Sequence, residues 1–80
     1  MADILVVDDN RPNREALASL LEVAGHRVRK APSARRALEA ALEKPPDLVV
    51  SDVLMLGMDG YVLARQLRSD PRTAALPVIF

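Results

Sequence analysis

Ile4-Leu5-Val6-Val7-Asp8-Asp9-Asn10 is the stretch that decides the fold of this chain, because it joins an apolar strand to two acids. Its first four residues are continuously apolar and rich in β-branched side chains. That pattern is typical of a strand covered on both faces of a parallel sheet. Asp8 and Asp9 follow the strand directly. In open parallel sheets function sits at the carboxyl ends of strands, so both acids stand where a site is expected.

A second apolar run, Leu48-Val49-Val50, repeats the pattern and leads to a third acid, Asp52. We expect Asp8, Asp9 and Asp52 to project from the same edge of the sheet. Like charges at close range repel each other, so the arrangement makes sense mainly if a hard cation or a chemical step occupies it. The alternative is helix capping, since acids before a first turn are favoured by the helix dipole. Capping explains one of these acids more easily than all three.

Helical and strand patterns alternate between and after these two runs. A first helix begins near Pro12 and ends at Gly25, followed by a charged strand from His26 to Lys30 that is typical of a sheet edge. A second helix is capped by Ser33 and ends before Pro45-Pro46. The apolar positions expected on the first helix are Leu17, Leu20, Leu21 and Ala24, and those on the second are Ala34, Ala37, Leu38, Ala41 and Leu42.

The last third of the chain contains one more helix and one more strand. Gly57 and Gly60 bracket a loop, helical character continues from Val62 to Leu67, and Pro77 to Phe80 begins a fourth strand. We expect Asp59 to cap this third helix and Gly60 to supply backbone freedom or close packing. Strand–helix alternation with short links predicts right-handed crossovers and a parallel α/β sheet.

Composition excludes several classes of function. The chain has 80 residues, which is one domain at most, and 11 basic residues balance 11 acidic ones. No bulk charge therefore favours nucleic acid or a membrane surface. The chain has no cysteine, and its N-terminus lacks the pattern of a signal peptide, which fits a cytoplasmic protein. No apolar run approaches the roughly 20 residues that cross a bilayer.

Four segments in collinear order give the chain a strong resemblance to the receiver domain of bacterial response regulators. They are Ile4–Asn10 (ILVVDDN), Asp47–Asp52 (DLVVSD), Met55–Gly60 (MLGMDG) and Pro77–Phe80 (PVIF). The resemblance covers essentially all of residues 1–80, treated as a single incomplete receiver domain. It implies a flavodoxin-like, doubly wound parallel sheet with strand order 2-1-3-4, lacking the last helix-strand-helix.

The resemblance also implies a function and a set of site residues. Asp52 would be the phosphoacceptor, taking a phosphoryl group from a sensor histidine kinase or a phosphotransfer protein. Asp8, Asp9, Asp52 and the backbone carbonyl of Leu54 would hold Mg²⁺. Such a module takes part in its own phosphorylation and turns over no external substrate. General chemistry agrees, since Mg²⁺ prefers oxygen ligands and phosphoryl transfer needs an in-line nucleophile with charge neutralisation.

Two departures from the family pattern are visible. Leu56 stands where the family usually has proline, which should loosen the loop after Asp52. A complete receiver continues beyond a strand such as Val78-Ile79-Phe80 with a Ser or Thr, a helix, a lysine-bearing strand and a closing helix. An apolar strand left at an edge recruits partners, so we expect self-association through the fourth strand, by dimerisation or by exchange of elements. The alternative is that these residues are a fragment of a longer regulator.

Two other functions stay open. The missing lysine and hydroxyl group suggest a phosphorylation-incompetent dimerisation or interaction module. A metal-dependent phosphohydrolase ranks last, because such enzymes place a second acid two residues after the nucleophile, where this chain has Leu54.

The remaining polar candidates have simpler explanations. His26 is expected to have a structural role rather than to bind metal or transfer protons. The basic residues are expected to be solvated rather than to bind nucleic acid, because no aromatic residues are interleaved with them. They are Arg27, Arg29, Lys30, Arg35 and Arg36.

Overall fold

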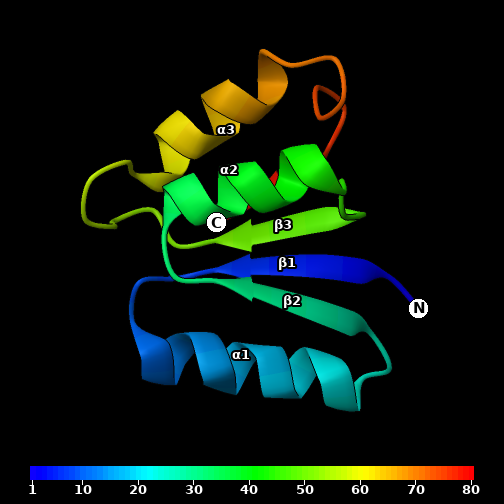
Figure 1. Cartoon of the computed structure of the whole chain (residues 1–80). Helices are drawn as coiled ribbons and strands as arrows, with labels where there is room; N and C mark the ends of the chain where they lie inside the picture. Colours follow the sequence, from blue (N-terminus) through cyan, green and yellow to red (C-terminus); the bar gives the residue numbers. More distant parts are fainter.

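The computed structural model describes all 80 residues, and strands alternate with helices as the sequence predicts (Figure 1). The elements are β1 (Asp3–Val7), α1 (Arg11–Val23), β2 (Arg27–Ala31), α2 (Ala34–Glu43), β3 (Leu48–Ser51), α3 (Gly60–Arg68) and β4 (Val78–Ile79). Their bounds differ from the predicted ones by at most two residues, as expected where helix and strand ends fray.

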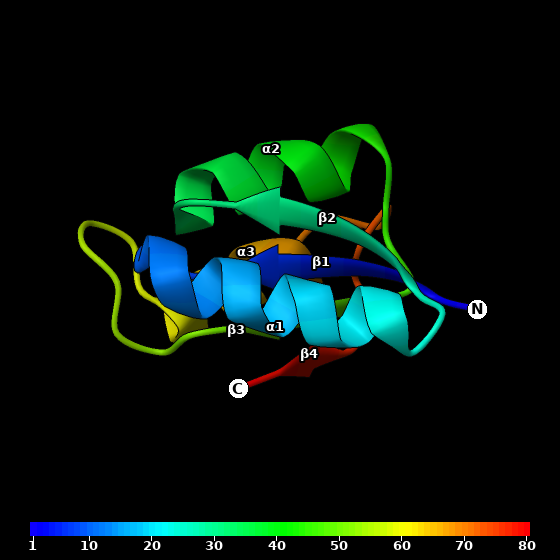
Figure 2. The same ribbon diagram turned by 90° about the horizontal axis from the view of Figure 1, so that it is seen from below.

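The strands form one sheet in the order β2-β1-β3-β4, and every neighbouring pair is parallel. The predicted strand order and flavodoxin-like architecture are therefore confirmed, and the charged strand β2 lies at an edge as expected. Helix α1 covers one face of the sheet, and α2 and α3 cover the other (Figure 2). The carboxyl ends of β1, β2 and β3 point the same way, toward the connections that lead into the helices (Figure 1).

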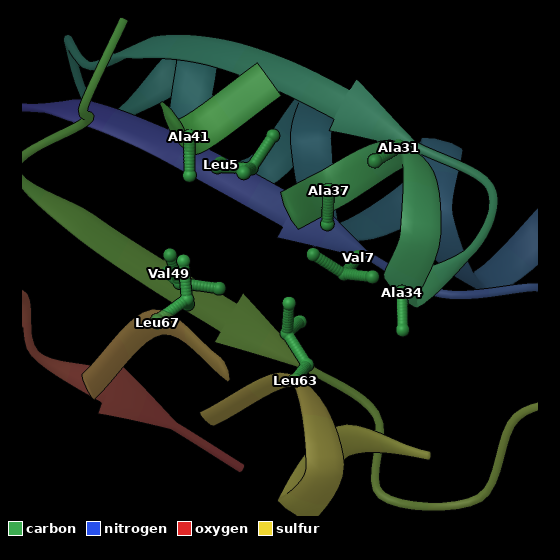
Figure 3. Packing of buried hydrophobic residues seen from close by; sticks show 9 residues of the cluster. All are labelled: Leu5, Val7, Ala31, Ala34, Ala37, Ala41, Val49, Leu63 and Leu67. Atoms are coloured by element: carbon green, nitrogen blue, oxygen red, sulfur yellow. The ribbon is translucent and has the colours of Figure 1, made fainter. Parts of the chain in front are cut away.

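The largest group of buried apolar residues lies between the sheet and the pair α2 and α3 (Figure 3). Small side chains on α2 allow that helix to approach the sheet closely, while leucines on α3 fill the space beside it. The residues of this cluster are Leu5, Val7, Ala31, Ala34, Ala37, Ala41, Val49, Leu63 and Leu67. The predicted apolar positions Leu38 and Leu42 of α2 are half-buried.

On the other face of the sheet, which α1 covers, one prediction is wrong. Leu20 of α1 is 68% exposed and Ala24, which caps the helix, is exposed, although both were expected on its apolar side. The residue of α1 that is buried is Ala18. Because α1 lies on its face of the sheet without a second helix beside it, only the side against the sheet is covered (Figure 2).

Each helix begins with a side chain that accepts a hydrogen bond from the main-chain N–H three residues later. These caps are Asn10 for α1, Ser33 for α2 and Asp59 for α3, and the last two were predicted. Gly25 follows the end of α1 with a φ of 96°, a left-handed conformation that favours glycine.

The charges of β2 are used within the fold. Arg29 pairs with Asp3 of β1 at 3.2 Å, and Lys30 pairs with Glu15 of α1 at 3.0 Å. The hydrogen bond from Lys30 lowers the pKa of Glu15. These pairs connect the edge strand with its neighbours.

None of the three helices has the length and apolar character that a bilayer crossing demands.

Candidate functional site

The register of the sheet brings two of the predicted acids side by side. Val7 of β1 is the direct partner of Ser51 of β3, so Asp8 and Asp52 follow at equivalent positions. Main-chain hydrogen bonds continue past both strand ends, from Asp8 N to Ala31 O at 3.2 Å and from Asp52 N to Val7 O at 2.9 Å. The backbone that carries these acids is therefore fixed by the sheet.

The side chains of Asp8, Asp9 and Asp52 form one acidic cluster. One carboxylate oxygen from each residue lies within 4.8 Å of the other two. Asp8 is half-buried, whereas Asp9 and Asp52 are exposed. The convergence expected from the sequence is thus present, and the cluster is open to solvent and to a partner molecule.

The three carboxylates differ in their hydrogen bonds. Asp8 Oδ1 accepts from the main-chain N–H of Asn10 at 2.9 Å, and Asp9 Oδ2 accepts from the main-chain N–H of Leu56 at 3.1 Å. No hydrogen bond in the structure ends on the carboxylate of Asp52. Asp8 and Asp9 each keep one oxygen free of protein donors, and Asp52 keeps both.

This donor set suits a small, hard cation. Mg²⁺ prefers oxygen ligands at about 2.1 Å, so opposite ligands lie about 4.2 Å apart. Adjacent ligands lie about 3.0 Å apart, and at most one pair among three ligands can be opposite. The spacing in the cluster, up to 4.8 Å, therefore matches that geometry once the carboxylates move inward or bind through bridging waters. Three negative charges at this separation also repel one another, and a divalent cation would relieve the repulsion. Asp8, Asp9 and Asp52 could therefore hold Mg²⁺.

The loop between β3 and α3 forms one wall beside the cluster. The predicted ligand Leu54 lies on this loop with an exposed side chain, and the role of its carbonyl oxygen stays a prediction. Met55 and Met58 pack against the apolar cluster. Gly60 is buried, and a side chain there would meet Asp52 O and approach Phe80 Cε1 to 2.8 Å. Of the two roles expected for Gly60, close packing is therefore the one that the structure supports.

His26 directly precedes β2, at the end of the sheet opposite to the acids, and it makes a structural contact. Its Nδ1 accepts a hydrogen bond from the main-chain N–H of Ala2 at 3.1 Å. This bond holds the turn before β2 against the start of the chain. It supports the structural role that we expected for this histidine.

Sequence reasoning missed two groups that support the acids. Arg14 of α1 donates from Nη1 to the carbonyl oxygen of Asp8 at 2.8 Å, which ties the first turns of the helix to the end of β1. The second group is the N–H of Leu56. The missing proline was expected only to loosen the loop, yet it leaves an N–H that binds Asp9. The absence of proline at position 56 is the feature of the sequence that could have indicated this bond.

Comparison with known sequences agrees with this geometry. Residues 4–80 match the family model of the response regulator receiver domain. Protein PilH of Pseudomonas aeruginosa is 40% identical over 79 residues, which make up 99% of this chain and 65% of PilH. The phosphate regulon transcriptional regulatory protein PhoB of the same organism is 38% identical over 76 residues, which make up 95% of this chain and 33% of PhoB.

Solved structures share the fold. The N-terminal domain of a response regulator receiver protein from Methanoculleus marisnigri superposes with a TM-score of 0.93 at 38% identity, covering 98% of this chain and 63% of that one. Chemotaxis protein CheY4 of Vibrio cholerae superposes with a TM-score of 0.92 at 32% identity, covering 98% and 65%. The chain spans less than two thirds of the length of each of these relatives. From the match over residues 4–80 and the shared fold, the chain belongs to the receiver domain family of response regulators, the signalling proteins of two-component systems.

Proposed function

We propose that this chain is a phosphoacceptor module of a two-component phosphorelay. Asp52 accepts a phosphoryl group from a phosphohistidine on a sensor histidine kinase or phosphotransfer protein, and Asp8, Asp9 and the Leu54 carbonyl help to hold Mg²⁺. The observation that carries the proposal is the exposed acidic cluster at the carboxyl ends of β1 and β3, in which the Asp52 carboxylate accepts no hydrogen bond.

The reaction asks little of the protein beyond position and charge. A carboxylate oxygen of Asp52 attacks the phosphorus atom, the P–N bond to the histidine breaks, and a P–O bond forms. The imidazole nitrogen leaves with the electron pair of the broken bond. Because no hydrogen bond occupies the Asp52 oxygens, their lone pairs are available for this attack. Bound Mg²⁺ would supply neutralisation of the negative charge on the transferring phosphoryl oxygens.

Asp8 and Asp9 have a different role, because other parts of the protein restrain them. Asn10 donates to the side chain of Asp8, Arg14 donates to its carbonyl oxygen, and Leu56 donates to Asp9. Fixed carboxylates bind a cation with less loss of conformational freedom than mobile ones. The three acids therefore divide into two restrained ligands and one unrestrained carboxylate. Asp52 can attack with one oxygen while its other oxygen helps to hold the cation.

Incubation with acetyl phosphate or beryllofluoride in millimolar Mg²⁺ tests the proposal. We expect a covalent phosphoryl adduct by intact-mass measurement, and amide NMR shifts around residue 52 with beryllofluoride. Asp52→Asn should abolish both responses, while Glu39→Gln, an exposed acid on α2, should leave them unchanged. Full modification of Asp52→Asn would show that another group accepts the phosphoryl, and would contradict the proposal.

A second proposal concerns self-association. The β4 edge of the sheet carries Ile79 and Phe80, which are 53% and 50% exposed, and Leu20 is exposed on the α1 face. The β2 edge, in contrast, carries charged residues. Exposed apolar edges recruit partners, so we propose that two copies pair through β4. In this form the chain could act as a phosphorylation-incompetent dimerisation module.

Light scattering after size exclusion tests the self-association. We expect a dimer at micromolar concentration and a shift toward monomer in Ile79→Lys, with Glu39→Gln as the control. A folded monomer at every concentration would contradict pairing through β4. Mg²⁺ binding without any phosphoryl uptake would favour the incompetent module over the phosphoacceptor.

A further inference from the structure

The N–H of Leu56 joins two segments that are 47 residues apart in the chain. It donates to Asp9 Oδ2 at 3.1 Å, and no other hydrogen bond in the structure reaches the side chain of Asp9. We propose that this N–H is a positioning group for Asp9, and that it couples the acidic cluster to the loop between β3 and α3. The inference rests on the proposed function, in which Asp9 helps to hold Mg²⁺.

The bond depends on the main chain of Leu56 and not on its side chain. The side chain is 88% exposed, so its removal changes little packing. A proline at this position has no N–H and cannot make the bond. Since the family usually has proline here, the contact is a property of this chain. A hydrogen bond to an ionised acceptor is also stronger than a neutral one, which favours a lasting restraint.

The bond acts on one oxygen of Asp9 and leaves the other free. With Oδ2 held by the loop, the carboxylate cannot rotate freely, and Oδ1 keeps both of its lone pairs for a cation. Asp9 is exposed and lacks other restraints, so removing the donor would let its side chain sample orientations that do not face Asp8 and Asp52. Restraint before binding reduces the entropy cost of holding the cation.

The same bond couples changes at the acidic cluster to the conformation of the loop between β3 and α3. Gly57 follows with a φ of 82°, so the chain turns sharply next to the bonded N–H. Leu56, Gly57 and Met58 then line one side of a cavity of about 260 Å³. Its other side is formed by Ser33, Ala34 and Arg35 at the start of α2. A cation that draws charge from Asp9 therefore changes the hydrogen bond that anchors one wall of this cavity.

Mg²⁺ titration of the chain and its variants, followed by amide NMR, tests the inference. In the native chain we expect the amides of Leu56, Gly57 and Met58 to shift together with those of Asp8 and Asp52. Leu56→Ala keeps the N–H and should behave like the native chain. Leu56→Pro should lose the response at Gly57 and Met58, keep it at Asp8 and Asp52, and bind Mg²⁺ roughly two- to tenfold more weakly, the effect of one hydrogen bond.

A metal-free measurement covers the case in which Leu56→Pro does not fold. Asp9→Ala removes the acceptor, so the Leu56 amide should exchange its hydrogen faster than in the native chain. Glu39→Gln should leave that exchange rate unchanged. An unchanged exchange rate in Asp9→Ala, or equal or tighter Mg²⁺ binding by Leu56→Pro, would overturn the inference. Failure of the native chain to bind Mg²⁺ would instead overturn the proposed site.

Discussion

Gly60 lies directly against the main-chain carbonyl oxygen of Asp52, and a Cβ at this position would collide with it. Gly60 N also donates to Val53 O at 2.9 Å, so the start of α3 is bonded to the loop directly after β3. The helix thus supports the strand end that carries the proposed nucleophile. This contact links the packing of the core to the chemistry of the site.

Replacing Gly60 with alanine should therefore disturb both stability and the site. We expect a loss of about 1–3 kcal/mol in the free energy of unfolding, because the methyl group overpacks the contact with Asp52, Ser51 and Phe80. Urea denaturation measures the loss. Gly25→Ala is the control: its φ of 96° makes alanine strained there, but nothing lies within 4 Å of the added Cβ. Only Gly60→Ala should also weaken Mg²⁺ binding; equal effects of the two variants on the site would contradict this link.

The N-cap of α2 should contribute a measurable part of the stability. Ser33 Oγ accepts from the N–H of Arg36 at 3.2 Å, so Ser33→Ala leaves that donor without its partner. We expect a loss of about 1 kcal/mol in the free energy of unfolding. Ser33→Asp keeps an acceptor at the cap and should remain close to the native stability. A loss in Ser33→Asp as large as that in Ser33→Ala would argue against capping as the cause.

Asp70, in the turn after α3, should make the stability of the folded chain depend on pH in the acid range. Hydrogen bonds from the Arg72 side chain and main chain lower the pKa of Asp70 from 3.8 to about 2. Because the pKa is lower in the folded chain, the unfolded chain binds more protons between these values, and stability rises with pH there. The contribution is present above about pH 4 and disappears as pH falls toward 2.

A carboxyl-carbon NMR titration checks this value. In Arg72→Ala the side-chain donor is lost while the main-chain donor remains, so the midpoint for Asp70 should rise but stay below 3.8. Arg68→Ala, an exposed arginine in the last turn of α3, is the matched control and should leave the midpoint unchanged. A midpoint that is the same in Arg72→Ala and the native chain would exclude the ion pair as the cause.

Repulsion within the acidic cluster should be visible when no divalent cation is present. Two unit charges about 5 Å apart in water repel by roughly 1 kcal/mol. Asp52→Asn removes the repulsion from both Asp8 and Asp9, so in EDTA it should raise the free energy of unfolding by about 1–2 kcal/mol. Screening should remove most of the gain in 1 M salt, where the Debye length is about 3 Å. Added Mg²⁺ should stabilise the native chain more than the variant. A variant that is less stable than the native chain in EDTA would contradict the assumed repulsion.

The fold followed from the sequence because its main signals are local. The apolar runs before Asp8 and Asp52 predicted buried parallel strands, and Ser33 and Asp59 were identifiable as caps from their position before apolar periodicity. Parallel register then placed Asp8 beside Asp52 without further information. Each of these inferences needed only neighbouring residues and the geometry of parallel strands.

The missed features depend on contacts between distant segments. Leu20 has the same helical spacing as a buried residue, and only the arrangement of helices on that face leaves it exposed. The bonds of Arg14 and Leu56 to the acids join side chain to main chain across turns and loops, where periodicity carries no information. Leu76 and Val78 are partly buried against the apolar cluster between the sheet and the helices α2 and α3. Their burial likewise depends on how the chain returns from the last turn to the sheet.

Isothermal titration with Mg²⁺ tests most directly whether Asp8, Asp9 and Asp52 act as one cation site. The native chain should bind one ion in the millimolar range or tighter, and Asp8→Asn and Asp9→Asn should each bind at least about tenfold more weakly, the effect of losing one charged ligand. Glu39→Gln, which removes an exposed acid on α2, should match the native chain. Equal Mg²⁺ affinity in all four proteins, or no binding by the native chain, would contradict a cation site built from these three carboxylates.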